Sequence, residues 1–116
     1  MPVDLGRAAA TFAAREAAAH AWVQERATRL RQRLPDAAAL LRAEYGATRV
    51  WHFGSLAAGT PHAESDVDLA VDQFEGAYFT ALSRLVDLFG AEVDLVVLPT
   101  ATDSLRERIL AEGVPL

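Results

Sequence analysis

The first third of the chain places apolar residues at helical spacing. Residues 7–33 contain neither glycine nor proline and consist mainly of Ala, Arg, Gln, Glu and Leu, which predicts one long helix. Its apolar residues form a thin stripe: Phe12, Ala19, Val23, Leu30 and Leu34. Such an alanine-rich stripe suits close packing within the domain, with a solvated arginine face, or docking on a partner. Trp22 is the candidate anchor for docking, because tryptophan often dominates interfaces.

Three further helices are predicted from similar patterns, each followed by a glycine that can end it: residues 36–45, 78–89 and 104–112. Asp36 is the expected N-cap of the first. Ser104 and Glu107 form an S-x-x-E capping box that is expected to open the last. The faces expected to be buried are formed by Leu40, Leu41, Tyr45, Tyr78, Leu82, Leu85, Val86, Phe89, Leu105 and Ile109.

Strands are predicted where β-branched and aromatic residues run together: residues 48–53, 66–71 and 91–98. Trp51, His52 and Phe53 of the first strand are interpreted as core residues, and residues 54–65 are expected to form a loop. This order of elements predicts an α+β fold, in which a small mixed β-sheet is flanked by helices and preceded by an extra N-terminal helix. We expect one face of the sheet to carry the polar site and the other to carry the helices.

The composition of the chain excludes several kinds of functional site. A chain of 116 residues with 52% hydrophobic residues predicts one compact domain, and the lack of cysteine excludes disulfides, thiolate metal sites and cysteine nucleophiles. We expect a cytoplasmic protein, because the N-terminus does not resemble a signal peptide and no apolar run is long enough to span a membrane. Residues 51–116 carry three arginines and eleven acidic residues. This excess of negative charge argues against direct binding of duplex nucleic acid and is compatible with divalent cations.

The candidate functional residues form a spaced motif. Gly54 and Ser55 are followed, after ten residues, by Asp66-Val67-Asp68, and Asp94 lies in the next predicted strand. Side chains alternate along a strand, so Asp66 and Asp68 are expected to share one face, where Asp94 can join them. Carboxylates this close repel one another and favour a cation, and Mg²⁺ prefers such oxygen ligands. Gly54 and Ser55 would allow backbone N–H groups to approach phosphate oxygens.

The segments FGSLAAGTPHAESDVDLAV, EVDLVVL and LRERILAEGVPL resemble the nucleotidyltransferase superfamily of the DNA polymerase β type. The short chain is most similar to the minimal nucleotidyltransferase group, whose members are usually encoded beside a HEPN-domain protein. The resemblance implies a nucleotidyltransferase domain at residues 36–116, with residues 1–35 as a helical extension. It also implies an antitoxin that transfers a nucleotidyl group, AMP from ATP, to a hydroxyl of a HEPN-domain toxin.

The same resemblance assigns roles to residues. Asp66 and Asp68 would bind two Mg²⁺ ions, with Mn²⁺ as an alternative, and Asp94 would bind the catalytic ion and help to deprotonate the acceptor. Gly54 and Ser55 would hold the β- and γ-phosphates, and Ser65 is assigned to the nucleotide site with them.

The chain departs from the family pattern after Gly-Ser, where arginines are common and this sequence has Leu56 and Ala58. Arg49 or Arg84 is a candidate replacement. Two alternatives follow: a binding module that neutralises its partner by occlusion, and a stand-alone enzyme that modifies small molecules. A second copy of the chain is the alternative partner. The remaining polar residues near the motif are interpreted as solvated: His62, Glu64, Asp72 and Glu92. The alternative for His62 is contact with phosphate, and the alternative for Glu64 is an influence on the metals.

Overall fold

The computed structural model describes residues 5–64 and 66–116. Two helices come first, α1 (Leu5–Gln32) and α2 (Leu34–Tyr45). The remaining elements in chain order are β1 (Val50–Phe53), α3 (Gly54–Ala57), β2 (Val67–Val71), α4 (Tyr78–Phe89), β3 (Val93–Val97), the 3₁₀ helix η1 (Leu98–Thr100), α5 (Asp103–Glu112) and β4 (Val114–Pro115). The predicted α+β fold is confirmed, and the three predicted strands are each shorter by one to three residues. None of the helices in the described ranges combines the length and the apolar character that a membrane span requires.

The sheet has four strands in the order β3-β2-β1-β4. Strand β1 pairs antiparallel with β2 and β4, whereas β2 and β3 are parallel. Strand β4 was not predicted, because a two-residue strand containing Pro115 gives no pattern in the sequence. Proline is tolerated there because β4 lies at the edge of the sheet.

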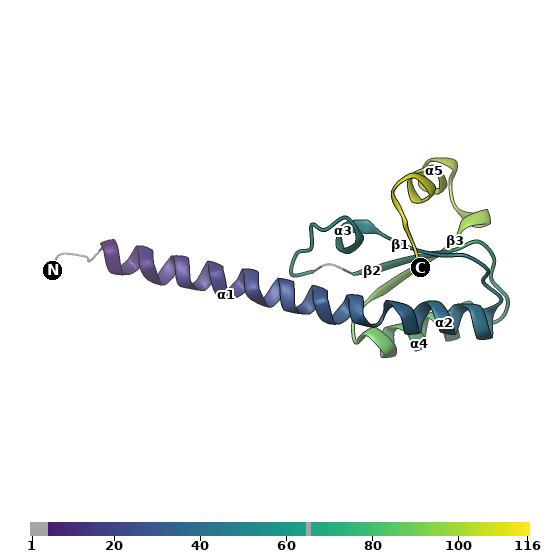
Figure 1. Cartoon of the computed structure of the whole chain (residues 1–116), viewed down its shortest axis with the longest axis horizontal. Helices are drawn as coiled ribbons and strands as arrows, with labels where there is room; N and C mark the ends of the chain where they lie inside the picture. Colours follow the sequence, from purple (N-terminus) through teal and green to yellow (C-terminus); the bar gives the residue numbers. More distant parts are fainter. Residues whose placement is uncertain (1–4, 65) are drawn as a thin grey trace.

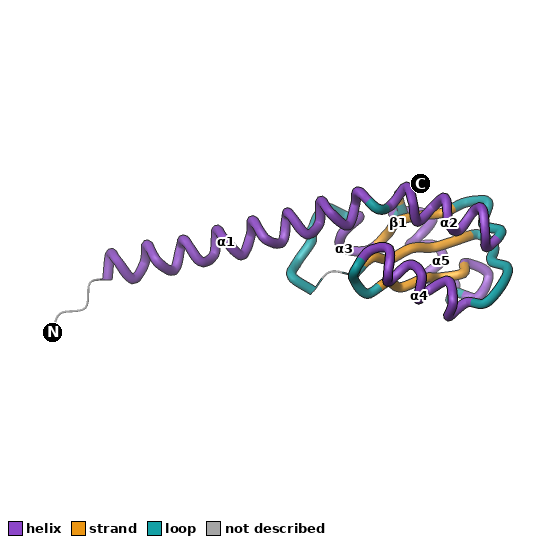
Figure 2. The backbone as a smooth tube through the Cα atoms, turned by 90° about the horizontal axis from the view of Figure 1, so that it is seen from below, coloured by secondary structure: helices purple, strands orange, loops and turns teal. Residues whose placement is uncertain are grey.

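Helices cover both faces of the sheet (Figures 1 and 2). One face packs on α2 and α4 and buries Val67, Leu69 and Val71 of β2. On the other face, Ile109 of α5 packs in a smaller cluster with Trp51, Phe53, Ala70 and Leu98. The face that we expected to be free of helices is therefore partly covered by α5, because Trp51 and Phe53 present apolar surface that Ile109 buries.

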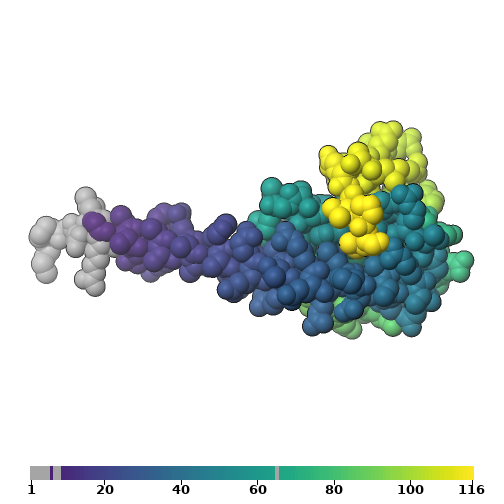
Figure 3. Space-filling model, viewed as in Figure 1, coloured from purple at the N-terminus to yellow at the C-terminus, as the bar shows by residue number. Residues whose placement is uncertain are grey.

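Helix α1 extends away from the body of the molecule as a single helix (Figures 1 and 3). Only its C-terminal turns are anchored, through the buried Ala27 and Leu30. Phe12 and Trp22 are 64% and 49% exposed and Ala19 is exposed as well, whereas Leu30 and Leu34 of the predicted apolar stripe are buried. Packing within the domain is therefore confirmed for the C-terminal end of the stripe, where Arg29 and Arg33 are exposed, whereas the part around Phe12 and Trp22 lies in solvent.

Two predicted helix caps are wrong. Arg33 is the N-cap of α2, and Asp36 lies inside its first turn. Thr102 caps α5 by accepting a hydrogen bond from the Leu105 N–H at 3.3 Å, so the helix starts one residue before Ser104 and does not use Glu107 in a capping box. A cap is set by where the chain enters the helix, which tertiary packing decides. The expected glycine ends of α2 and α4 are confirmed, since Gly46 and Gly90 adopt φ of 73° and 64°.

Asp72, which was expected to be a solvated charge, also organises the start of β1. Its Oδ1 accepts hydrogen bonds from the N–H groups of Thr48, Arg49 and Gln73 at 2.9 to 3.0 Å. Asp72 lies at the surface as predicted, but its structural role was not foreseen, because the donors of Thr48 and Arg49 reach it only once β1 and β2 pair.

His52 makes the stability of the protein depend on pH. The side chain is 3% exposed, and its Nε2 atom has no hydrogen-bond partner in the described part of the chain. Burial, together with the nearby charge of Arg31, lowers the pKa of His52 to about 4. The unfolded chain therefore binds more protons between about pH 6.5 and 4, and we expect this group to remove about 3 kcal/mol of stability as the pH falls through that range.

Urea unfolding of the wild type and of His52→Leu across this pH range measures the effect. The wild type is expected to lose more stability than the variant as the pH falls. Equal losses would contradict the prediction.

Candidate active site

Three carboxylates lie at one edge of the β2–β3 pair. Asp68 and Asp94 are Cα partners in the parallel pairing, and Asp66 directly precedes β2. The alternating burial of Val67 and Leu69 against α2 and α4 places Asp68 on the opposite, α5-facing side. The structure therefore brings Asp68 and Asp94 together across neighbouring strands, with Asp66 two residues away along the chain.

The surroundings of Asp68 disfavour its charged form. Burial, followed by the charges of Asp94 and Asp66, raises the pKa of Asp68 to about 6, while the charge of Arg108 opposes the shift. The described residues hold no group of three or more acidic or histidine side chains already gathered around one point as metal ligands. The three carboxylates nevertheless have the oxygen donors that a hard cation such as Mg²⁺ prefers.

Gly54 lies against Asp68. Its φ is +82°, and a Cβ atom at this position would lie 2.0 Å from Oδ2 of Asp68. Any other residue would therefore displace either the turn or the carboxylate. Ser55 follows in α3, where its carbonyl accepts a hydrogen bond from the Thr60 N–H at 3.1 Å. The turn and the acidic residues are thus in direct contact, whereas Ser65 lies outside the described residues.

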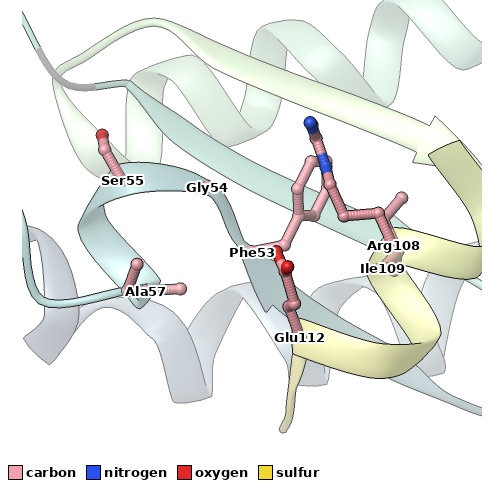
Figure 4. Close-up of a pocket in the computed structure, with 8 residues that line it drawn as sticks. Phe53, Gly54, Ser55, Ala57, Arg108, Ile109 and Glu112 are labelled. Carbon is pink, nitrogen blue, oxygen red and sulfur yellow. The ribbon is translucent and has the colours of Figure 1, made fainter.

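A pocket of about 270 Å³ opens between this turn and α5 (Figure 4). One wall is formed by Gly54, Ser55 and Ala57, and the opposite wall by Arg108, Ile109 and Glu112 of α5. Arg108 is the residue that sequence reasoning missed. Its i, i+4 spacing from Glu112 puts both on one face of α5, but only the fold shows that this face meets Gly54.

The arginines considered as replacements lie elsewhere. Arg49 stacks on the Trp51 ring at 4.6 Å, near the end of β1 that is remote from Gly54. Arg84 forms an ion pair with Glu44 and donates a hydrogen bond to the Tyr45 hydroxyl on the α2–α4 side. Arg108 is therefore the better placed cation, because it lines the pocket and its charge acts on Asp68.

The two positions that lack arginine have different environments. Leu56 is fully buried in the main core, whereas Ala58 is exposed and lines the pocket. Their equivalent appearance in the sequence is therefore misleading, since only position 58 borders the pocket.

The remaining polar residues agree with the solvated interpretation. His62, Glu64 and Glu92 are exposed. Nδ1 of His62 accepts a hydrogen bond from the Glu64 N–H at 3.3 Å, so this contact stays within the loop. Trp51, His52 and Phe53 are buried as predicted.

Comparison with known proteins agrees with this geometry. A family described as Polymerase beta, Nucleotidyltransferase matches residues 38–116. A solved structure of a candidate minimal nucleotidyltransferase is 36% identical, with a TM-score of 0.65, over 78% of this chain and 95% of that one. A toxin–antitoxin structure with AMP-PNP is 28% identical, with a TM-score of 0.61, over 67% of each chain.

A mutant of the toxin–antitoxin MntA–HpeT is 25% identical, with a TM-score of 0.61, over 71% of this chain and 69% of that one. No curated protein matches the sequence with significance. The family match covers more than half of the chain and includes every element that forms the pocket. The chain therefore belongs to the polymerase β nucleotidyltransferase family, as a domain of the minimal nucleotidyltransferase type.

Proposed function

We propose that this protein is a Mg²⁺-dependent nucleotidyltransferase that transfers AMP from ATP to a hydroxyl of a HEPN-domain partner and thereby acts as an antitoxin. The observation that carries the proposal is the contact between Gly54 and Asp68, with Asp94 paired to Asp68 on the next strand. It puts a glycine-containing turn, whose backbone could approach phosphate oxygens, beside acidic residues, and phosphoryl transfer requires such an arrangement. We assign this activity to residues 36–116, with residues 1–35 as an extension.

In the proposed reaction the acceptor oxygen bonds to the α-phosphorus of ATP, and the bond from that phosphorus to the bridging oxygen breaks. Pyrophosphate leaves, and Asp94 receives the hydroxyl proton. Gly54, Ser55 and Ser65 hold the phosphates. Asp66, Asp68 and Asp94 would hold two Mg²⁺ ions, which would neutralise the charge that develops on the phosphate oxygens.

Arg108 supplies a positive charge on the pocket wall opposite Gly54. The turn itself lacks arginine, so in this proposal the triphosphate is neutralised by the metal ions, by backbone N–H groups and by Arg108. A partner protein supplies the remaining positive charge. An arginine supplied by a partner accelerates other phosphoryl transfers by about 10³ to 10⁵.

The proposed partner and substrate are supported by likeness to solved complexes. Two similar structures are toxin–antitoxin structures, one of them with AMP-PNP. The exposed Phe12 and Trp22 of α1 offer apolar surface for such a partner.

The experiment mixes the protein with Mg²⁺, ATP labelled at the α- or γ-phosphate, and the HEPN-domain protein encoded beside it. Transfer of the α label alone to the partner, and a mass increase equal to one or more AMP groups, would support the proposal. Tight association without added mass, with every nucleoside triphosphate, would support occlusion instead. The buried Leu56 favours that second function, because it puts no cation where arginine is common in the family.

Metal affinity is expected to depend on pH through Asp68. Its pKa of about 6 means that metal binding must displace a proton in more acidic solution. We expect Mn²⁺ affinity to be constant above about pH 7 and to fall by up to about tenfold per pH unit below 6. Calorimetry in two buffers of different ionisation enthalpy would detect the released proton. An affinity that does not change between pH 7 and 5 would contradict this assignment.

A further inference from the structure

The turn at α3 is held from behind by a residue of α1. Backbone N–H groups of Ala58 and Thr60 donate to the carbonyls of Gly54 and Ser55. The next carbonyl, that of Leu56, accepts a hydrogen bond at 2.9 Å from Nη2 of Arg31, which lies 25 residues earlier in the chain. Carbonyls at the end of a helical turn carry partial negative charge, so a guanidinium group is a favourable partner for them.

Arg31 is itself fixed in place. Ala27, Leu30 and Leu34 anchor the same stretch of chain in the main core, and the Arg31 side chain is half-buried. The buried His52 lies near it and remains neutral at physiological pH because of its low pKa. His52 therefore adds no positive charge that would repel the Arg31 guanidinium group, which donates its hydrogen bond to the Leu56 carbonyl.

The turn has two sides with different partners. Gly54 contacts Asp68 on the side of the carboxylates, whereas the Leu56 carbonyl binds α1. The Leu56 side chain is fully buried in the main core. Removing the Arg31 bond would leave a carbonyl without its donor and would loosen a turn of only four residues.

We propose that Arg31 is a positioning residue that holds the Gly54–Ala57 turn in the conformation that binds the triphosphate. The C-terminal part of α1 thereby belongs to the nucleotide site, although it lies before the family match and contributes no residue to the pocket lining. The effect on nucleotide binding rests on the function proposed above, whereas the effect on the turn does not.

Hydrogen exchange and ligand binding test the two parts separately. The variants are Arg31→Gln, which removes the charge, and Arg31→Lys, which keeps it, with Arg29→Gln as an exposed control on the same helix. We expect amides of residues 54–60 to exchange about tenfold faster in Arg31→Gln, with residues 67–71 unchanged as an internal control for folding. Arg31→Lys is expected to restore part of the protection, and Arg29→Gln should match the wild type.

For binding, we expect about tenfold weaker ATP affinity in Arg31→Gln, with Mn²⁺ affinity in the absence of nucleotide changed less than about twofold. Two results would overturn the inference. One is unchanged exchange at residues 54–60 in Arg31→Gln, and the other is faster exchange along the whole chain in both Arg31→Gln and Arg31→Lys. A wild type that binds neither Mn²⁺ nor ATP would instead refute the proposed function, even if the exchange at residues 54–60 responds to Arg31.

Discussion

Replacement of both Asp66 and Asp68 by asparagine is expected to lower the rate of AMP transfer by at least about a thousandfold. Asparagine keeps the shape of aspartate and removes its charge, so the variant loses the anionic ligands of the metal ions. The fold should survive, because the raised pKa of Asp68 shows that its charge is unfavourable in the metal-free protein. Since Asp68 is partly exposed, we expect Asp68→Asn alone to raise the metal-free stability by about 1 kcal/mol.

Glu92→Gln is the matched control, because Glu92 is exposed and lies two residues from Asp94. It should keep both activity and metal binding. The readouts are the transfer rate by mass spectrometry, Mn²⁺ affinity by calorimetry and stability in urea with a chelator present. A double variant that still transfers AMP at the wild-type rate would show that these carboxylates are misassigned.

Replacement of Leu56 by arginine is expected to unfold most of the protein, although arginine is common at this position in the family pattern. Leu56 is fully buried, and its own carbonyl already binds the guanidinium group of Arg31. A second guanidinium group would have to be buried in the apolar core that surrounds the Leu56 side chain. We expect a loss of more than about 4 kcal/mol, which is a large part of the total stability of a domain of this size.

Ala58→Arg is the matched comparison, because Ala58 is exposed and borders the pocket. We expect its stability to stay within about 0.5 kcal/mol of the wild type and its ATP affinity to rise about tenfold. Thermal unfolding and calorimetric titration with ATP and Mg²⁺ measure both effects. A well-folded Leu56→Arg protein would show that the core around α3 accommodates a charge, and the family pattern would then apply to this chain directly.

Local signals in the sequence predicted much of the fold. The strand containing Trp51, His52 and Phe53 and the glycine ends at Gly46 and Gly90 depend on residue type and short spacing, which a sequence shows directly. The helix starts at Asp36 and Ser104 were predicted wrongly for different reasons. Helix α2 begins after Arg33 without any side-chain cap, whereas α5 begins after Thr102, which the packed chain selects over the neighbouring Asp103 and Ser104. Strand β4 could not be found, because its two residues form a strand only by pairing with β1.

By itself, the sequence determined that Asp66 and Asp68 point away from the core, because side chains alternate along a strand. It also determined that a glycine precedes Ser55, where backbone freedom is needed, because both properties are local. Only the tertiary structure decided that Asp68 pairs with Asp94, that Arg108 lines the pocket and that Arg31 reaches Leu56. It also separated Leu56 from Ala58, which look equivalent in the sequence. These contacts join residues far apart in the chain, and they follow from strand register and from which face of the sheet each helix covers, which no local pattern specifies.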